Sequence, residues 1–243
     1  MKSTQTNKTV LLIPLFAFLL LFNSCIDDFF IEGNGISKTE YRSASGFDHI
    51  SVNGDYHVTV MPGNDYSVEV TADCNLIPFI ETDVIGNTLK IRTRGLYSLR
   101  QDFPIEVYIT TPELKELAMS GSGLIETGNF MSNDFNIAVS GSGDIKTAIN
   151  ASQIKATVSG SGTISLEGNA NETNFVISGS GKIKSYKLEQ QHCQAIISGS
   201  GNMFVNAVQT IDARISGSGR VYYINHPAIH TSISGSGNVI DKN

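Results

Sequence analysis

The feature of this sequence that most constrains its fold is the tetrapeptide Ser-Gly-Ser-Gly, which occurs seven times at a nearly regular spacing. The copies stand at 120–123, 140–143, 159–162, 178–181, 198–201, 216–219 and 234–237. A period of roughly 20 residues is typical of stacked repeats, in which each unit buries its apolar side only against its neighbours. The chain therefore predicts a long repetitive structure in this region.

Aligning the seven copies separates inward from outward positions. An apolar residue always precedes the tetrapeptide (Met119, Val139, Val158, Ile177, Ile197, Ile215, Ile233). Another always stands two residues after it (Ile125, Ile145, Ile164, Ile183, Met203, Val221, Val239). Side chains of a strand alternate between faces, so the glycines point inward and the serines outward. The serines then form two columns: Ser120, Ser140, Ser159, Ser178, Ser198, Ser216, Ser234 and Ser122, Ser142, Ser161, Ser180, Ser200, Ser218, Ser236.

This pattern predicts an all-β fold, a single-chain parallel β-solenoid of about seven coils. Each coil would contain a strand, a Ser-Gly-Ser-Gly corner, a second strand and a turn, with a perimeter of roughly 60 Å. The handedness rule for parallel crossovers favours a right-handed coil. A strict left-handed helix of six-residue sides would need a constant period, whereas the positions of the copies show that the period varies.

The segment upstream of the repeats, residues 45–118, is irregular but rich in strand patterns such as "YHVTV" and "IEVYI". We expect it to form a β-rich N-terminal cap, continuous with the solenoid of residues 119–243, because a parallel edge must be covered. The stretch "SVNG" at 51–54 resembles a degenerate tetrapeptide. "CNLIPFIETDV" is predicted to contain a short helical turn.

The first 24 residues read as a bacterial lipoprotein signal peptide. Lys2 and Lys8 precede 13 uncharged, almost wholly apolar residues at 10–22, too few to span a bilayer as a helix. Ser24 and Cys25 follow, so we expect Cys25 to carry lipid; ordinary secretory cleavage nearby is the alternative. Residues 25–44 would then form a tether. Its Asp27-Asp28 pair is consistent either with an export signal for surface lipoproteins or with simple solvation.

Charge excludes one class of partner. Removing residues 1–24 takes away two lysines and no acidic residue, so the net charge changes from −6 to −8. An acidic chain without a basic run is not suited to bind nucleic acid.

Cysteines and histidines give no sign of a metal site. Cys74 and Cys193 could form a disulfide in an oxidising compartment, but Cys193 occupies an inward position, so a small buried side chain is the better interpretation. His226 and His230 are four residues apart, and Pro227 between them disfavours a helix. No metal or other cofactor is predicted.

The lipoprotein leader, the opening "FDHISVNGDYHVTV" and the serial "SGSG" resemble the bacterial family called putative auto-transporter adhesin, head GIN domain. The resemblance covers about residues 45–243. It implies a β-solenoid in the cell envelope and an adhesin-like role, and it supplies no catalytic motif.

An enzyme is an alternative because parallel β-helices also host polysaccharide lyases and glycosidases. Such sites need clustered carboxylates. The outward acids Glu126, Asp144 and Asp212 fall in different columns. A calcium ladder would need oxygen ligands in every coil, whereas Lys182 and Arg220 occupy the position of Asp144 in two other coils.

Two surface features remain as candidate contact sites. The serine columns could hydrogen-bond a polymer or could simply solvate tight corners. The outward column three residues past the tetrapeptide ends in an apolar stripe of Phe204, Tyr222 and Ile240. This stripe either contacts another copy or a partner, or is covered by a neighbouring turn.

The sequence thus predicts a non-catalytic envelope lipoprotein, anchored in the outer membrane by its N-terminal lipid and exposed at the cell surface or in the periplasm. The leading function is adhesin-like binding of a surface polymer, such as a polysaccharide, or of a partner protein. A self-associating structural component, oligomeric through its C-terminal coils, is the second interpretation. A polysaccharide-active enzyme is the third, and the absence of Trp weakens it.

Overall fold

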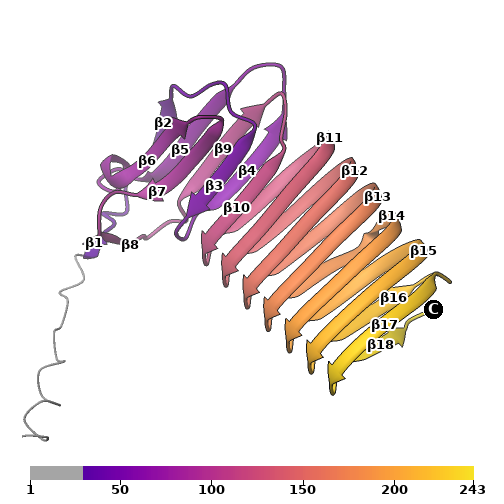
Figure 1. Cartoon of the computed structure of the whole chain (residues 1–243). Helices are drawn as coiled ribbons and strands as arrows, with labels where there is room; N and C mark the ends of the chain where they lie inside the picture. The colour runs from indigo at the N-terminus through magenta and orange to yellow at the C-terminus, as the bar shows by residue number, and fades with distance from the viewer. Residues whose placement is uncertain (1–29) are drawn as a thin grey trace, which may run out of the picture.

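The protein is described here by a computed structural model that covers residues 30–243 (Figure 1). These residues form strands and connecting segments, apart from one 3₁₀ turn at Ile77–Phe79. The predicted all-β class, the solenoid of about seven turns and the short helical turn are confirmed. The signal peptide and Cys25 lie outside the described residues.

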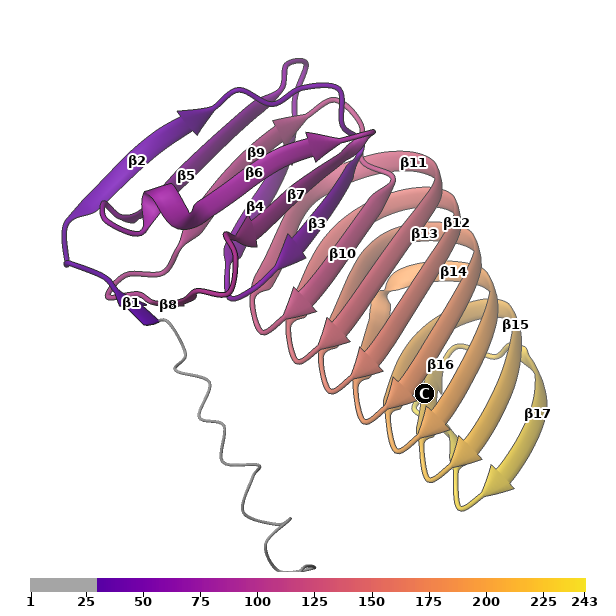
Figure 2. The same cartoon turned by 60° about the vertical axis from the view of Figure 1, so that its left-hand side comes forward.

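Nine parallel strands build the solenoid. They are β10 (Glu116–Gly121), β11 (Leu124–Gly141), β12 (Asp144–Gly160), β13 (Thr163–Gly179), β14 (Lys182–Gly199), β15 (Asn202–Gly217), β16 (Arg220–Ile224), β17 (Ala228–Gly235) and β18 (Asn238–Asp241). Corresponding serines pair in register from coil to coil, as in Ser140, Ser159 and Ser178. Each coil has one sharp corner at the tetrapeptide, beside the arrowheads in Figure 2, and one rounded bend opposite.

The rounded bends differ from the expected turns because β11 to β15 run through them without interruption. The pairing register shifts there between β11 and β12, between β13 and β14, and between β14 and β15. Strands β12 and β13 belong to coils of equal length, since the tetrapeptides that bound them are evenly spaced, and these two strands pair without a shift. Differences in coil length are therefore absorbed as bulges at the bend, which leaves every corner aligned.

Asparagine side chains connect successive coils at these bends. Asn150 Nδ2 donates to Asn129 Oδ1 (3.2 Å), and Asn169 Nδ2 donates to Asn150 Oδ1 (2.9 Å). Asn225 Nδ2 donates in the same way to Asn206 Oδ1 (2.5 Å). Stacked amides of this kind link neighbouring strands along the rod axis.

The two glycines of a tetrapeptide are required for different reasons. Gly160 has φ +123°, a conformation that only glycine adopts easily, and an added Cβ would lie 2.5 Å from the carbonyl oxygen of Gly141 in the preceding coil. Gly162 has no positive φ, but a Cβ there would meet Val139 Cγ1 at 2.6 Å and the backbone of Gly143. The corner therefore needs one glycine for its backbone conformation and both for space.

The predicted alternation of faces is confirmed along the solenoid. All fourteen serines of the two columns are exposed. The apolar columns on either side of the tetrapeptide are buried in the first six coils. In the last coil, Ile233 is 42% exposed because no further strand in the described chain covers it.

The cap extends both walls of the solenoid by two layers. On one wall, β3 (His49–Asn53) pairs with β10 and with β7 (Thr88–Thr93); on the other, β4 (His57–Pro62) pairs with β11 and with β9 (Glu106–Thr111). Antiparallel strands then close the walls: β6 (Ile80–Ile85) on the first, β5 (Ser67–Asp73) and β2 (Ser37–Arg42) on the second.

The degenerate coil exists, but the predicted alignment is two positions too early. Asn53 pairs with Ser120, and Gly54 has φ +136°, so Asn53 and Gly54 match the first Ser-Gly rather than the second. Buried Tyr56 stands at the position of Gly123. An aromatic ring thus stands at a corner position that is glycine in the regular coils.

The folded region begins before residue 45. Residues 30–42, which we expected to belong to a tether, contain β1 (Phe30–Glu32) and β2. Strand β1 pairs with β8 (Ser98–Arg100), and β2 pairs with β5.

Within residues 30–243 both cysteines, Cys74 and Cys193, are free thiols. Cys193 is buried, as expected, and this burial raises the pKa of its thiol to about 12. Cys74 is half-buried on the cap. The interpretation of Cys193 as a small core side chain is therefore confirmed.

Candidate functional site

Each coil presents two outward faces. We call face A the outward side chains that precede the tetrapeptide and face B those that follow it. Face A carries a groove of about 390 Å³ that crosses β11 to β15 just after the rounded bend. One wall consists of Asp134, Gln153, Glu172 and His192, and the other of Asn136, Lys155, Asn174, Gln194 and Asp212. Strand register aligns the members of each wall.

Strand geometry sets the dimensions of this groove. Neighbouring side chains of one wall are ~4.8 Å apart along the rod, and the two walls are roughly 7 Å apart along the strand. Between them lies the buried column of Phe135, Ile154, Thr173 and Cys193. The groove is therefore a straight channel with the same kind of polar lining in each successive coil.

Hydrogen-bonding capacity is left over in the groove. Gln153 Nε2 donates to Glu172 Oε2 at 3.3 Å. The Oδ1 atom of Asn174 is buried and has no hydrogen-bond partner among residues 30–243. Because this oxygen is buried, a ligand could donate to it only after the Asn174 side chain rotates outward, and the cost of a buried acceptor without a donor favours that rotation.

The predicted serine columns lie at the other end of face A. The first column, represented by Ser159, is separated from the groove by a row that contains Thr157, Val176 and Ile196. Face A thus presents a polar groove, a partly apolar row and a row of hydroxyls. The second column lies at the corner itself.

The predicted stripe of Phe204, Tyr222 and Ile240 lies on face B. The rings of Phe204 and Tyr222 stack with centroids 5.0 Å apart, Tyr186 packs edge-on against Phe204, and Lys242 Nζ lies 5.6 Å from the Tyr222 centroid. All three stripe residues are half-buried. Their apolar surface is therefore already partly covered within the chain.

The groove does not have the carboxylate arrangement of a glycosidase. Asp134 and Glu172 share a wall but stand two coils apart, about 10 Å by strand spacing, and Gln153 lies between them instead of an open space for the scissile bond. Among residues 30–243, no group of three or more His, Cys, Asp or Glu side chains is placed to hold a metal ion.

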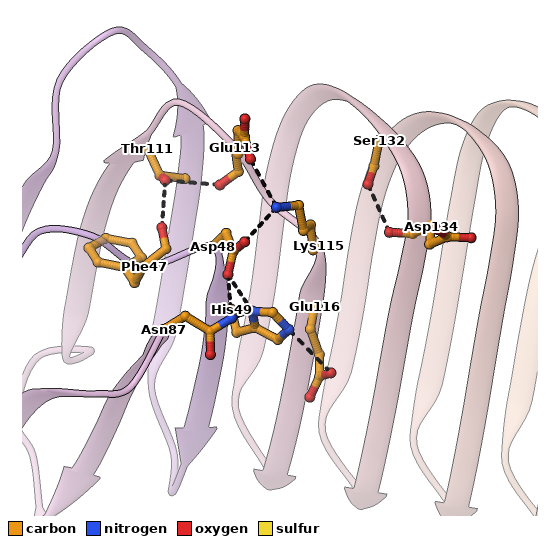
Figure 3. Close-up of polar contacts among 10 residues, drawn as sticks. All are labelled: Phe47, Asp48, His49, Asn87, Thr111, Glu113, Lys115, Glu116, Ser132 and Asp134. Atoms are coloured by element: carbon orange, nitrogen blue, oxygen red, sulfur yellow. Dashed lines mark hydrogen bonds and ion pairs between the residues drawn. The ribbon is translucent and has the colours of Figure 1, made fainter.

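A second polar cluster lies where the cap meets the first coil (Figure 3). Asp48 accepts hydrogen bonds from Lys115 Nζ and Asn87 Nδ2, both at 2.7 Å, and lies 2.5 Å from His49 Nδ1. Its backbone carbonyl also accepts from Lys115 N. Asp48 thus joins β3, the β6–β7 turn and the segment that enters β10, which indicates a structural junction.

Acid should weaken this junction. Burial alone would raise the pKa of Asp48, but hydrogen bonds from Lys115, His49 and Asn87 outweigh it and lower this pKa to about 2. The carboxylate therefore adds about 2 kcal/mol of stability above about pH 4, which is lost as the pH falls toward 2. Urea unfolding of Asp48→Asn should show that loss at pH 7 and a flatter profile below pH 4.

Glu113→Gln provides the control for this prediction. Glu113 also contacts Lys115, at 3.0 Å, but its side chain is 66% exposed. Exposed ion pairs contribute little, so this variant should unfold within about 0.5 kcal/mol of the parent. Equal losses in the two variants would contradict the role assigned to Asp48.

The fold and the groove together define a class: a capped parallel β-solenoid whose flat wall carries a lateral groove. Residues 46–227 match the family described as putative auto-transporter adhesin, head GIN domain, so the chain belongs to that family. No curated protein was found to match the sequence.

Solved structures share this fold. A putative adhesin from Bacteroides fragilis is 21% identical with a TM-score of 0.82, the match covering 87% of this chain and 100% of the other. A putative lipid binding protein from Parabacteroides distasonis is 28% identical with a TM-score of 0.75, covering 88% of this chain and 100% of the other. A putative adhesin from the same species, 24% identical with a TM-score of 0.72, covers the same shares.

The sequence prediction missed the groove. Its residues stand four and six positions before each tetrapeptide, whereas the predicted contact columns lie within the tetrapeptide or after it. Counting backward from Ser140 in the same way reaches Asn136 and then Asp134. That count would have shown two polar columns side by side in four successive coils.

Proposed function

We propose that this protein is a non-catalytic, adhesin-like binding module of the cell envelope, and that the face A groove holds an extended polymer or an extended segment of a partner protein. The observation that carries the proposal is the repetition of polar groups in every coil of the groove. A ligand with a regular repeat can meet equivalent groups at each step of ~4.8 Å.

The chemistry of the groove favours a neutral ligand rich in hydroxyl or amide groups. Its lining consists mainly of amides and carboxylates, with Lys155 as the only lysine or arginine. Asn174 Oδ1 lacks a hydrogen-bond partner among residues 30–243 and would accept from a ligand once the side chain turns into the groove. A polysaccharide fits this lining, although the groove contains no Tyr or Trp on which a sugar ring could stack.

Anchoring is the second part of the proposal. Cys25 would carry the lipid that holds the protein in the outer membrane, with the rod displayed at the cell surface or in the periplasm. Within residues 30–243, no helix combines the length and apolar character needed to cross a bilayer. The short apolar leader supports export, and a lipid on Cys25 would then attach the protein to the membrane.

A retention assay tests the binding role. A lipid-free form beginning at residue 26 would be incubated with insoluble polysaccharides, cell-wall material and matrix proteins, and the supernatants checked for released sugar. Asn174→Ala combined with Gln194→Ala should weaken retention roughly tenfold, the loss of two hydrogen bonds. Lys184→Ala combined with Asn202→Ala, on face B, should leave it unchanged.

Each other outcome changes the conclusion. Equal loss in both double variants would assign binding to a surface other than the groove. Released sugar would identify an enzyme. Retention on none of the materials would favour the alternative, a self-associating envelope component.

The C-terminal end of the rod is what favours this alternative. Ile229 and Ile233 of β17 pair in register with the core residues Ile211 and Ile215, yet they are 37% and 42% exposed. The half-buried stripe on face B lies in the same coils. Self-association should appear as a dimer or larger species on sizing at micromolar concentration, reduced by Tyr222→Ser; a monomer in both cases would exclude it under these conditions.

A further inference from the structure

Exposed apolar side chains gather around the two-stranded unit of β1 and β8. Leu96 is 90% exposed, Phe30 and Phe103 are each 46% exposed, and Tyr97 is 39% exposed. Phe30 pairs with Ser98 in β8, while the other three residues flank that strand within five positions. We call these four residues the β1–β8 patch.

The patch is rigidly mounted on the cap. Buried Asp73 accepts hydrogen bonds from Gly35 N (2.8 Å) through Oδ1 and from Asp102 N (3.1 Å) through Oδ2. Gly33 N donates to the carbonyl of Arg100 at 2.7 Å. The segments that follow β1 and β8 are therefore fixed to the same carboxylate, and the patch is part of the folded structure.

The β1–β8 patch does not carry an unbalanced charge from Arg100. The guanidinium of Arg100 lies 4.1 Å above the ring of Phe30 and 3.6 Å from Glu32, so its charge is balanced locally. Exposed Phe and Leu side chains beside a long cationic side chain are typical of elements that lie in the membrane–water interface, where the apolar side chains enter the bilayer and the cation extends toward water.

The position of the patch in the chain selects the partner. Phe30 stands five residues after Cys25, the proposed lipid site. Five residues span at most about 17 Å when fully extended. A lipid held at Cys25 therefore keeps the β1–β8 patch within a short distance of the bilayer, whereas the solenoid extends away from this edge of the cap (Figures 1 and 2).

We propose that the β1–β8 patch is a membrane-contact surface that inserts into the headgroup region of the bilayer carrying the lipid anchor. Insertion of an apolar edge by about 5–10 Å is typical of interfacial elements. The lipid alone would leave the rod free to rotate, and the patch adds a second contact that orients it. This inference rests on the anchor in the proposed function.

The sequence offers a direct test because it contains no Trp. Leu96→Trp and Met131→Trp each introduce one indole at a highly exposed position, since Met131 is 82% exposed at a solenoid bend. The lipidated full-length protein would be reconstituted in phosphatidylethanolamine and phosphatidylglycerol vesicles with or without brominated acyl chains. Flotation, with Cys25→Ser as its control, would measure anchoring separately.

The expected result is that Leu96→Trp protein floats, emits at shorter wavelength and is quenched about twofold or more by bromine, as a depth of several ångströms requires. Met131→Trp protein should float and stay unquenched. Flotation without quenching of Leu96→Trp, or equal quenching of both variants, would overturn the membrane-contact surface and leave the anchor intact. Failure of the parent protein to float would overturn the anchor and this inference together.

Discussion

Gly160→Ala is expected to lower the free energy of unfolding by about 3–5 kcal/mol, one of the two largest effects predicted for a single substitution in this chain. Two costs add there. The φ of +123° is strained for any residue with a side chain, and the new Cβ would lie 2.5 Å from the carbonyl oxygen of Gly141. A backbone oxygen in a paired coil cannot move without disturbing its own hydrogen bonds, so the strain has no easy relief.

Two other glycines separate these costs. Gly86, in the turn between β6 and β7, has φ +65° and nothing within 4 Å of an added Cβ, so alanine should cost about 1 kcal/mol there. Gly162 has no positive φ but meets the backbone of Gly143 and Val139 Cγ1, so alanine should cost about 2–3 kcal/mol through crowding alone. The urea unfolding midpoints of the three alanine variants would give their losses in unfolding free energy. A Gly160→Ala loss no larger than that of Gly86→Ala would show that the corners can spread apart.

The regular part of the fold could be predicted because its signal is repeated. A single "SGSG" says little, but seven copies reveal which columns are always apolar. The alternation of side chains along a strand then places every serine on the outside and every glycine on the inside. The structure confirms this placement, including the exposure of all fourteen serines. One inward column was less predictable, because it mixes apolar Leu166 and Val205 with polar residues. Thr127 and Thr147 share a hydrogen bond of 2.7 Å there, and Ser185 Oγ donates to the carbonyl of Phe204.

The rounded bends and the cap could not be predicted in detail because they are not periodic. The unequal spacing of the tetrapeptides reveals that some coils are longer than others, and only the pairing register shows that the difference is absorbed at the bend. Near this bend β14 places Gln190 in the core, in register with buried Ala170, and its Oε1 accepts a hydrogen bond from Thr173 Oγ1. Likewise, Tyr56 replaces a corner glycine in the cap, which hid the true alignment of Asn53 and Gly54.

The candidate site illustrates a different limit. The alternation of side chains along a strand places Asn174 and Gln194 on the outside, but it cannot distinguish a flat polar face from a groove. That distinction depends on the shape of the strands just after the bend, which the alternation of side chains does not describe. The aromatic stripe on face B shows the converse: its outward direction was predicted, while its partial cover by Tyr186 comes from the longer coil of β14.

Phe175→Ala is expected to cost about 3–5 kcal/mol, because its neighbours in the same core column are too small to fill the space. Phe175 is fully buried and pairs in register with Ala156 on one side and Ala195 on the other. Phe175→Leu, which keeps most of the volume, should cost less than about 1.5 kcal/mol. Moving the ring by one coil, with Ala195→Phe added to Phe175→Ala, should recover part of the loss, since the two sites share one space. Urea unfolding would measure all three variants. If the double variant loses the sum of the two single costs, a ring at position 195 does not fill the space left by Phe175, and the explanation from the small neighbouring alanines is wrong.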